Sequence, residues 1–280
     1  MKHWMAALLL VASTAWAAPA GLKSTAMGRG PTLVMIHNLG GNRSMWMPTV
    51  RKLLPNYRVV LVDLPGHGDS PMPDPFTLQA GAALIDQVLA EQKPDSTVVV
   101  AQGMGAQMAL LALEQHPERA RGLVAIEMSL KKPCNIPDQQ REAFFSMIDK
   151  DYDTFIKNTY TALTGDSAQR VALHVMAAQV PAPVMKSYLR DMMSFNPTEK
   201  AKNVKTPLLL LITDRIWSVD RDSTAIVNLQ GYDALPASKF ALRHIRDCGI
   251  LVATEQPDSL AAQIGAFSRQ VLATKASASK

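Results

Sequence analysis

The amino-acid sequence predicts an α/β domain with a mostly parallel sheet and helices on both faces of it. Short apolar runs rich in β-branched residues alternate along the chain with amphipathic segments long enough to form helices. The apolar runs are continuous, which is typical of parallel strands buried on both faces. Hydrophobic residues make up 48% of the 280 residues and charged residues 19%, a composition that supports one large core and excludes a disordered chain.

The alternation can be followed in order from residue 31. Strands are expected at residues 31–37, 57–62, 97–101, 123–126, 208–212 and 240–245. Helices are expected at residues 44–54, 77–92, 106–116 and 259–272. Because helices separate the strands, the connections should be right-handed crossovers, which produce a parallel sheet.

The alternation stops between residues 128 and 206, where the pattern is helical and rich in Met and Ala. Its methionines are expected to pack this segment on the core or to line an adaptable apolar pocket. They are Met147, Met176, Met185, Met192 and Met193. The expected organisation is a core of residues 18–127 and 207–273, a helical cap of residues 128–206, and a flexible tail of residues 274–280.

Residues 1–17 have the features of a secretory signal peptide. Lys2 and His3 precede an apolar run at residues 5–12, and Ala15-Trp16-Ala17 is a small-x-small cleavage site. The run is far shorter than the roughly 20 residues needed to span a bilayer. We therefore expect a periplasmic or secreted protein with no stable membrane insertion after cleavage; an uncleaved anchor is the alternative.

Charge and cysteine usage exclude other classes of function. The net charge of +5 comes from scattered Lys and Arg residues, so no nucleic-acid partner is expected. Cys134 and Cys248 are too far apart for a CxxC pair, and neither a metal nor a cofactor is expected. Both cysteines should lie in loops at the carboxyl edge of the sheet, where a disulfide can form in an oxidising compartment. A nucleophilic Cys248 is the alternative, although no histidine is predicted beside it.

Four sequence blocks resemble those of the α/β-hydrolase superfamily. Residues 37–41 (His-Asn-Leu-Gly-Gly) resemble its oxyanion loop, and residues 63–70 resemble its Asp-x-Pro-Gly-x-Gly-x-Ser turn. Residues 101–105 (Ala-Gln-Gly-Met-Gly) stand where Gly-x-Ser-x-Gly is expected, after a strand and before a helix. Residues 249–257 are similar to the C-terminal block that starts Gly-His and ends Glu-x-Pro. The resemblance covers residues 31–272 and implies a single-domain, cap-containing α/β-hydrolase fold.

The same resemblance implies that all three positions of the catalytic triad are substituted. Gly103 stands at the nucleophile position, Ile250 at the histidine position and Ile216 at the acid position. Acyl transfer on this fold needs a nucleophile, a base and a carboxylate that orients the base, and none of the three residues supplies one. Glycine also relieves the strained backbone of such a turn.

These substitutions predict an inactive pseudo-hydrolase that binds a small apolar or carbonyl-containing ligand under its cap. The oxyanion hole should persist, because Leu39 and Met104 would contribute only their backbone N–H groups to it. The expected pocket residues are Asn38, Leu39, Gln102, Gly103, Met104, Glu127, Ile216 and Ile250.

Two other interpretations stay open. In the first, the chain is an active hydrolase or lyase, of ester type if a hydrolase, whose non-standard site uses His37, Glu127 or Asp214; one version pairs His37 with Glu127. His244 is interpreted as a packing residue inside the last strand, which leaves Asp214 without a predicted base, and His67 as a turn or surface residue. In the second, the chain is a structural or partner-binding protein with a collapsed pocket.

Overall fold

Seven strands form one sheet in the order β1-β3-β2-β4-β5-β6-β7 in the computed structural model, which describes residues 21–72, 74–132 and 137–278. The strands are β1 (Ser24–Gly28), β2 (Thr32–Ile36), β3 (Arg58–Val62), β4 (Thr97–Gln102), β5 (Leu123–Ile126), β6 (Leu208–Thr213) and β7 (Phe240–Ile245). Strands β2 to β7 run parallel to one another, which confirms the predicted parallel sheet. The antiparallel edge strand β1, which pairs with β3, was not predicted.

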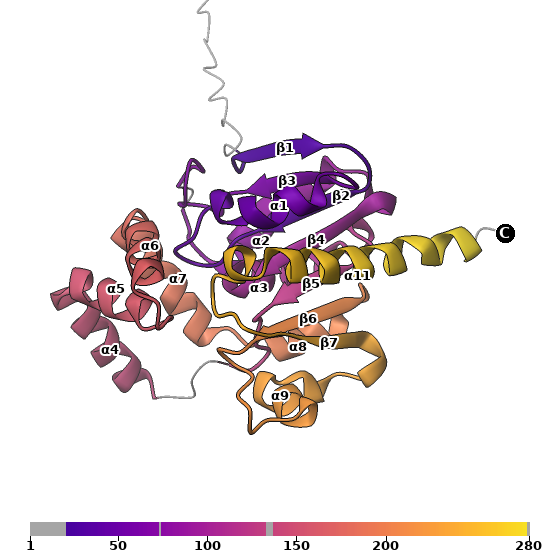
Figure 1. The fold of residues 1–280 in the computed structure, drawn as a ribbon. Helices are drawn as coiled ribbons and strands as arrows, with labels where there is room; N and C mark the ends of the chain where they lie inside the picture. The colour runs from indigo at the N-terminus through magenta and orange to yellow at the C-terminus, as the bar shows by residue number, and fades with distance from the viewer. Residues whose placement is uncertain (1–20, 73, 133–136, 279–280) are drawn as a thin grey trace, which may run out of the picture.

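Helices cover both faces of the sheet (Figure 1). On one face lie α1 (Met47–Leu53) and α11 (Pro257–Ala278), which contact each other. On the other face lie α2 (Leu78–Ala90) and α3 (Gly103–Gln115), which also pack together. The closing helix α11 extends at both ends beyond the expected residues 259–272. The short helices α9 (Ser223–Gln230) and α10 (Val252–Glu255) were not predicted.

Successive residues of the central strands enter two different apolar layers. On β2, Val34 and Ile36 belong to the layer that contains residues of α2 and α3, whereas Leu33 and Met35 belong to the layer that contains residues of α1 and α11. All four side chains are fully buried. Burying an aliphatic side chain of this size contributes roughly 1.5–3 kcal/mol, so the continuous apolar runs stabilise both layers.

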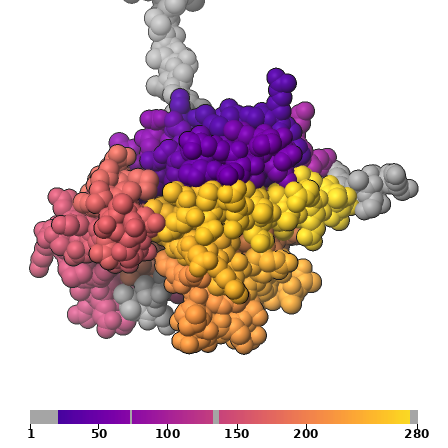
Figure 2. Space-filling view, in the orientation of Figure 1, coloured from indigo at the N-terminus to yellow at the C-terminus, as the bar shows by residue number. Residues whose placement is uncertain are grey.

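The segment between β5 and β6 contains five helices in its described part. They are α4 (Asp138–Lys150), α5 (Tyr152–Thr161), α6 (Ser167–Ala178), α7 (Ala182–Ser194) and α8 (Pro197–Asn203). Helices α4 to α7 form a group at the carboxyl side of the strands, which bulges from the body of the molecule (Figures 1 and 2). Met176, Met185 and Met192 pack on the core as expected, but Met147 is 58% exposed and does not.

Some predictions fall outside the described residues. The signal peptide at residues 1–17 and Cys134 belong to this group. Among the residues that are described, no helix has the length and apolarity needed to cross a membrane.

Candidate active site

The turn from β4 to α3, which we call the elbow, has a glycine at its apex. Gly103 directly follows β4, begins α3 and has a φ of +52°, in the left-handed region that favours glycine. A Cβ atom at this position would lie 2.2 Å from Oδ1 of Asn38. The apex therefore offers no nucleophilic side chain, and the amide of Asn38 fills the space in front of it.

Asn38 also occupies the expected oxyanion hole. Its Oδ1 atom accepts hydrogen bonds from the backbone N–H groups of Leu39 (2.8 Å) and Met104 (2.9 Å). These are the two donors that the sequence predicts for the hole, and they converge on one oxygen as a carbonyl-binding site requires. Because that oxygen belongs to the chain itself, a substrate carbonyl would first have to displace the Asn38 side chain.

The cavity between this turn and the cap has a volume of about 20 Å³. Such a space holds about one water molecule. Of the expected pocket residues, Asn38, Leu39, Gln102 and Ile250 line it, whereas Gly103, Met104, Glu127 and Ile216 do not. Cap side chains that include Tyr160, Leu163, Leu173 and Met176 close it from the other side. The open apolar pocket expected under the cap is therefore absent from the described structure.

His37 serves to hold the loop that carries Asn38. Its ring is fully buried, with Nδ1 2.7 Å from the carbonyl oxygen of Asn38 and Nε2 accepting the backbone N–H of Leu64 at 3.0 Å. Burial, with a smaller contribution from the neighbouring His67, lowers the pKa of His37 to about 3. A neutral imidazole with both nitrogens engaged orients the loop and has no nitrogen left for a substrate.

Glu127 is committed to an ion pair. It stands after β5 with a φ of +49°, and its side chain is 1% exposed. Its carboxylate accepts a hydrogen bond from the Thr213 hydroxyl and pairs with the guanidinium of Arg215, whose Nε lies 3.0 Å from Oε2. The partners of Glu127 and His37 are different, so the structure does not form the acid/base pair of these two residues.

His67 is a buried residue, and its interpretation as a turn or surface residue is wrong on burial. The residue is 1% exposed, and its Nε2 accepts the backbone N–H of Gly40 at 3.2 Å. Burial lowers its pKa to about 4. His67 therefore joins the turn at residues 63–70 to the loop at residues 37–41.

Cys248 is a free, buried thiol whose Sγ lies 3.3 Å from the carbonyl oxygen of Ile245. Burial raises its pKa to about 12, and nearby carboxylates, led by Glu255 and Asp214, add to the rise. The thiolate needed for nucleophilic attack is therefore suppressed at neutral pH. The expected disulfide involves Cys134, which lies outside the described residues.

Asp214 has a base beside it that the sequence interpretation missed. Nε2 of His244 lies 2.6 Å from Oδ1 of Asp214, whose Oδ2 accepts the backbone N–H of Asp247 at 2.7 Å. The indole of Trp217 stacks on the imidazole, with centroids 4.6 Å apart and planes at 6°. The sequence signal was present: Asp214 follows β6, His244 is the penultimate residue of the neighbouring parallel strand β7, and both belong at one edge.

The His244–Asp214 pair borders an open cleft of about 690 Å³. The cleft is lined by Asp214, Trp217, Ser218, Val219, Arg221, His244, Arg246 and Asp247. Its volume lies in the range of small-molecule sites. The His244 side chain is 18% exposed, and no hydrogen-bond partner of its Nδ1 occurs among the described residues. The described residues contain no cluster of three or more His, Cys, Asp or Glu side chains that could hold a metal ion.

Comparison with known proteins relates the chain to hydrolases. A family model described as "alpha/beta hydrolase fold" matches residues 31–197. The pimeloyl-[acyl-carrier protein] methyl ester esterase of Yersinia enterocolitica is 33% identical over 102 residues, which are 36% of this chain and 37% of that protein. The protein of the same name from Legionella pneumophila is 30% identical over 135 residues, 46% of this chain and 54% of that one. The chain thus spans about a third to a half of the length of these relatives.

The solved structures agree on the fold. The hydrolase olei00960 from Oleispira antarctica superposes with a TM-score of 0.75, covering 88% of this chain and 94% of that one at 16% identity. A thermophilic esterase from Thermogutta terrifontis gives a TM-score of 0.72 at 19% identity, covering 89% and 93%. At these identities the likeness shows the fold alone.

These findings correct two expectations from the sequence. The inactive pseudo-hydrolase that binds a ligand under its cap is contradicted, because the relatives at 30–33% identity are named as esterases. The missing triad favoured a non-enzyme without excluding an enzyme, and the same names contradict that preference. Gly103 supplies no nucleophilic side chain at the turn, whereas the His244 side chain is 18% exposed and pairs with Asp214.

Proposed function

The chain belongs to the α/β-hydrolase family, and from this premise we propose that it hydrolyses small carboxylic esters with the His244–Asp214 pair as its base. The observation that carries the proposal is the 2.6 Å contact between these side chains at an open cleft. Relatives named as methyl ester esterases support the ester class of substrate.

His244 has the arrangement of a general base. When Nε2–H donates to Asp214, the second ring nitrogen, Nδ1, is the proton acceptor. The carboxylate holds this tautomer and stabilises the imidazolium that forms, while stacking on Trp217 fixes the ring plane. A water molecule at Nδ1 loses a proton to the ring as its oxygen adds to the ester carbonyl carbon.

The reaction continues through a tetrahedral intermediate. As the C–O bond to water forms, the π electrons of the carbonyl move onto its oxygen. Arg221 and Arg246 line the cleft, and their positive charges stabilise this oxyanion. When the intermediate collapses, the bond to the alkoxy oxygen breaks and the proton on Nδ1 passes to the leaving alcohol. The products are one carboxylic acid and one alcohol, and the imidazole is neutral again.

Turnover of p-nitrophenyl acetate and butyrate by the purified chain tests this function. We expect saturable hydrolysis by the wild type and a fall in kcat of roughly 10²–10⁴-fold in His244→Gln, the usual contribution of a general base. His174→Gln, on cap helix α6, is the matched control and should keep wild-type activity. A wild type without turnover, or a His244→Gln variant of unchanged activity, would contradict the proposal.

Intact-mass spectrometry after acid quenching identifies the nucleophile. If water attacks the ester, no acyl group remains on the protein at any time during turnover. Ser218 lines the same cleft, and an acyl adduct on its hydroxyl would replace water as the nucleophile while keeping His244 as base. An acyl adduct on any residue outside the cleft would contradict the proposal that the ester is hydrolysed there.

We also propose that this activity operates in the periplasm or outside the cell. The support is the leader-like sequence of residues 1–17, with its apolar run and its Ala15-Trp16-Ala17 site. Fractionation of expressing cells, with N-terminal sequencing of the product, tests the location. A cytoplasmic protein that retains residues 1–17 would contradict it.

A further inference from the structure

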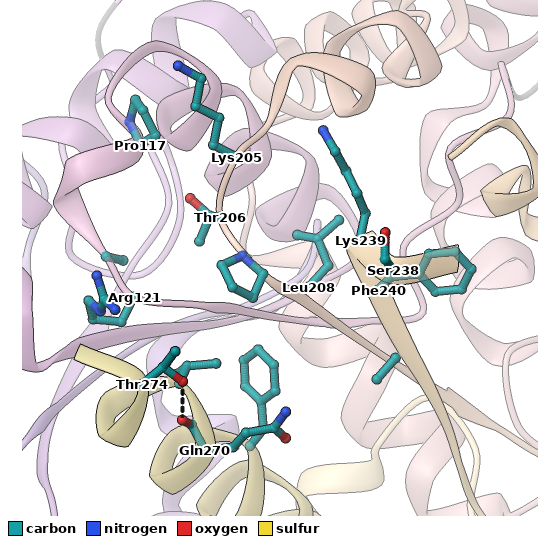
Figure 3. Close-up of a pocket in the computed structure, with 15 residues that line it drawn as sticks. Pro117, Arg121, Lys205, Thr206, Leu208, Ser238, Lys239, Phe240, Gln270 and Thr274 are labelled. Atoms are coloured by element: carbon teal, nitrogen blue, oxygen red, sulfur yellow. Dashed lines mark hydrogen bonds between the residues drawn. The ribbon is translucent and has the colours of Figure 1, made fainter. Parts of the chain in front are cut away.

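A second pocket lies at the opposite edge of the sheet, near the amino ends of β6 and β7 and the C-terminal part of α11 (Figure 3). Its volume is about 460 Å³. Leu208, which lines it, begins β6, and Asp214 follows the end of that six-residue strand. About 20 Å of strand therefore separates this pocket from the His244–Asp214 cleft.

The charges around this pocket are all of one sign. Arg121, Lys205 and Lys239 line it, and no acidic residue in the described part of the chain does. Figure 3 shows the three basic side chains on the segments that lead into β5, β6 and β7, with Lys205 and Lys239 extending away from Arg121. Arg121 and Lys205 have no carboxylate partner among the described side chains, unlike many other basic residues of the chain. Lys239 is held by its Nζ, which donates to the carbonyl oxygens of Lys202 (2.9 Å) and Val204 (3.1 Å).

Two residues of the pocket wall carry polar atoms without a partner. Thr206 is 5% exposed, and its buried Oγ1 makes no hydrogen bond within the described structure. Nε of Arg121 is likewise buried and unpaired there. Buried polar groups are nearly always hydrogen-bonded, and each exception calls for an explanation. Both groups can donate a hydrogen bond, so an anion is the partner that suits them.

Apolar residues form much of the remaining wall, which also includes Ser238, Gln270 and Thr274. Phe267 and Val271 of α11, both less than 9% exposed, line the pocket from one apolar layer, and Leu208 and Phe240 line it at the starts of the two strands. A carboxylate or phosphate alone would contact only the basic side of such a pocket. An apolar body attached to the anion would contact the apolar part of the wall and keep its own surface from water.

We propose that this pocket binds an organic carboxylate with a short apolar chain. The carboxylate lies against Arg121 and accepts a hydrogen bond from Thr206, the charge of Lys205 adds to the attraction, and the chain lies along Phe267 and Val271. The pocket volume is within the range of small-molecule sites. This site is independent of the ester-hydrolysing cleft proposed above.

Isothermal titration calorimetry with octanoate tests the site, with 1-octanol and inorganic phosphate as the two partial ligands. We expect octanoate to bind the wild type with 1:1 stoichiometry, and each partial ligand to bind at least about tenfold more weakly, since it forms only part of the contacts. Phosphate that binds as tightly as octanoate would overturn the apolar half of the proposal. Octanol that binds as tightly would overturn the anionic half.

Variants locate the binding. Arg121→Gln should weaken octanoate about tenfold or more, and Thr206→Val, which keeps the side-chain shape, should weaken it about threefold to tenfold. Lys93→Gln, at an exposed lysine outside the pocket, should change nothing. His244→Gln should bind octanoate as the wild type does. No octanoate binding, unchanged binding in Thr206→Val, or binding lost in His244→Gln would overturn the proposal.

Discussion

Oδ1 of Asn38 lies 2.9 Å from the backbone nitrogen of Met104, so an amide of the chain occupies the position where a substrate oxyanion binds in a working elbow. The missing side chain of Gly103 makes this contact possible, because a Cβ atom there would collide with the same amide. Residues 38 and 103 are therefore structurally coupled. The backbone N–H donors at the elbow are already hydrogen-bonded to Asn38, and the cavity beside it holds about one water molecule. For this reason we propose that catalysis takes place at the His244–Asp214 cleft.

The coupling predicts that Gly103→Ser is destabilising and that Asn38→Gly partly compensates it. The serine is strained at a φ of +52° by about 1–3 kcal/mol, and its Cβ also displaces the Asn38 amide. In the double variant the collision is absent, so the two free-energy changes should not add. Urea denaturation of the four proteins measures this.

Gly165→Ser is the control for the glycine substitution, because no atom lies within 4 Å of a Cβ at that position. We expect it to change the free energy of unfolding by less than about 0.5 kcal/mol. Strictly additive effects of Asn38→Gly and Gly103→Ser would contradict the coupling.

Asp63 is expected to be a structural carboxylate at the start of the turn of residues 63–70. It is 1% exposed, accepts the backbone N–H groups of Arg43 (2.7 Å) and Asp69 (3.0 Å), and pairs with the Arg43 guanidinium. Asp63→Ala leaves these donors without an acceptor and should cost about 3 kcal/mol or more. Asp69→Ala removes an exposed carboxylate from the same arginine and should cost less than about 1 kcal/mol. Equal losses in chemical denaturation would contradict this.

The two buried histidines predict lower stability in acid. The folded-state pKa values of His37 and His67 are about 3 and about 4, below the ordinary value of 6.5 for histidine. Between pH 6.5 and about 4 the unfolded chain binds protons that the folded chain does not, so the free energy of unfolding falls as the pH falls. Each histidine contributes a slope of up to about 1.4 kcal/mol per pH unit, and neither contributes above that window.

Urea denaturation from pH 4.5 to 8 measures this slope. His67→Asn should flatten it whatever its effect on absolute stability, while His116→Gln, at a half-exposed histidine, should leave it as in the wild type. An unchanged slope in His67→Asn would show that this ring is not the source.

Asp214→Asn should lower kcat for ester hydrolysis about tenfold to a hundredfold, because the amide no longer stabilises the imidazolium of His244. In the double variant with His244→Gln, the loss should equal that of His244→Gln alone, since the two residues act as a unit. Steady-state kinetics of the three variants measures this, and multiplicative losses would mean that Asp214 acts independently of His244.

Most of the fold was predictable because the buried strands are continuous apolar runs. β2 and β4 are buried throughout, and their sequences, TLVMI and TVVVAQ, consist mostly of apolar residues. β1 was missed because it is an edge strand whose residues are mostly exposed, so it lacks that signal. The start of α3 was predicted at residue 106 and lies at Gly103, since a glycine there does not indicate a helix.

The candidate site was less predictable because it depends on contacts between distant side chains. The glycine at the elbow follows from its place between a strand and a helix, but the rotamer that puts Asn38 into the oxyanion hole has no sequence signature. His244 was interpreted as a packing residue because Asp214 is 30 positions away in the chain. Only the register of β6 and β7 brings the two together.

Chemical rescue of His244→Ala tests the central claim most directly. The variant removes the imidazole but keeps the Trp217 ring and the Asp214 carboxylate that held it, so added imidazole has a binding place. We predict that millimolar imidazole restores p-nitrophenyl acetate turnover saturably, above the rate of imidazole alone, and fails to do so in Asp214→Asn/His244→Ala. An His244→Ala variant as active as the wild type, or one whose rate with imidazole only equals the sum of the separate rates, would contradict the assignment of His244 as the base.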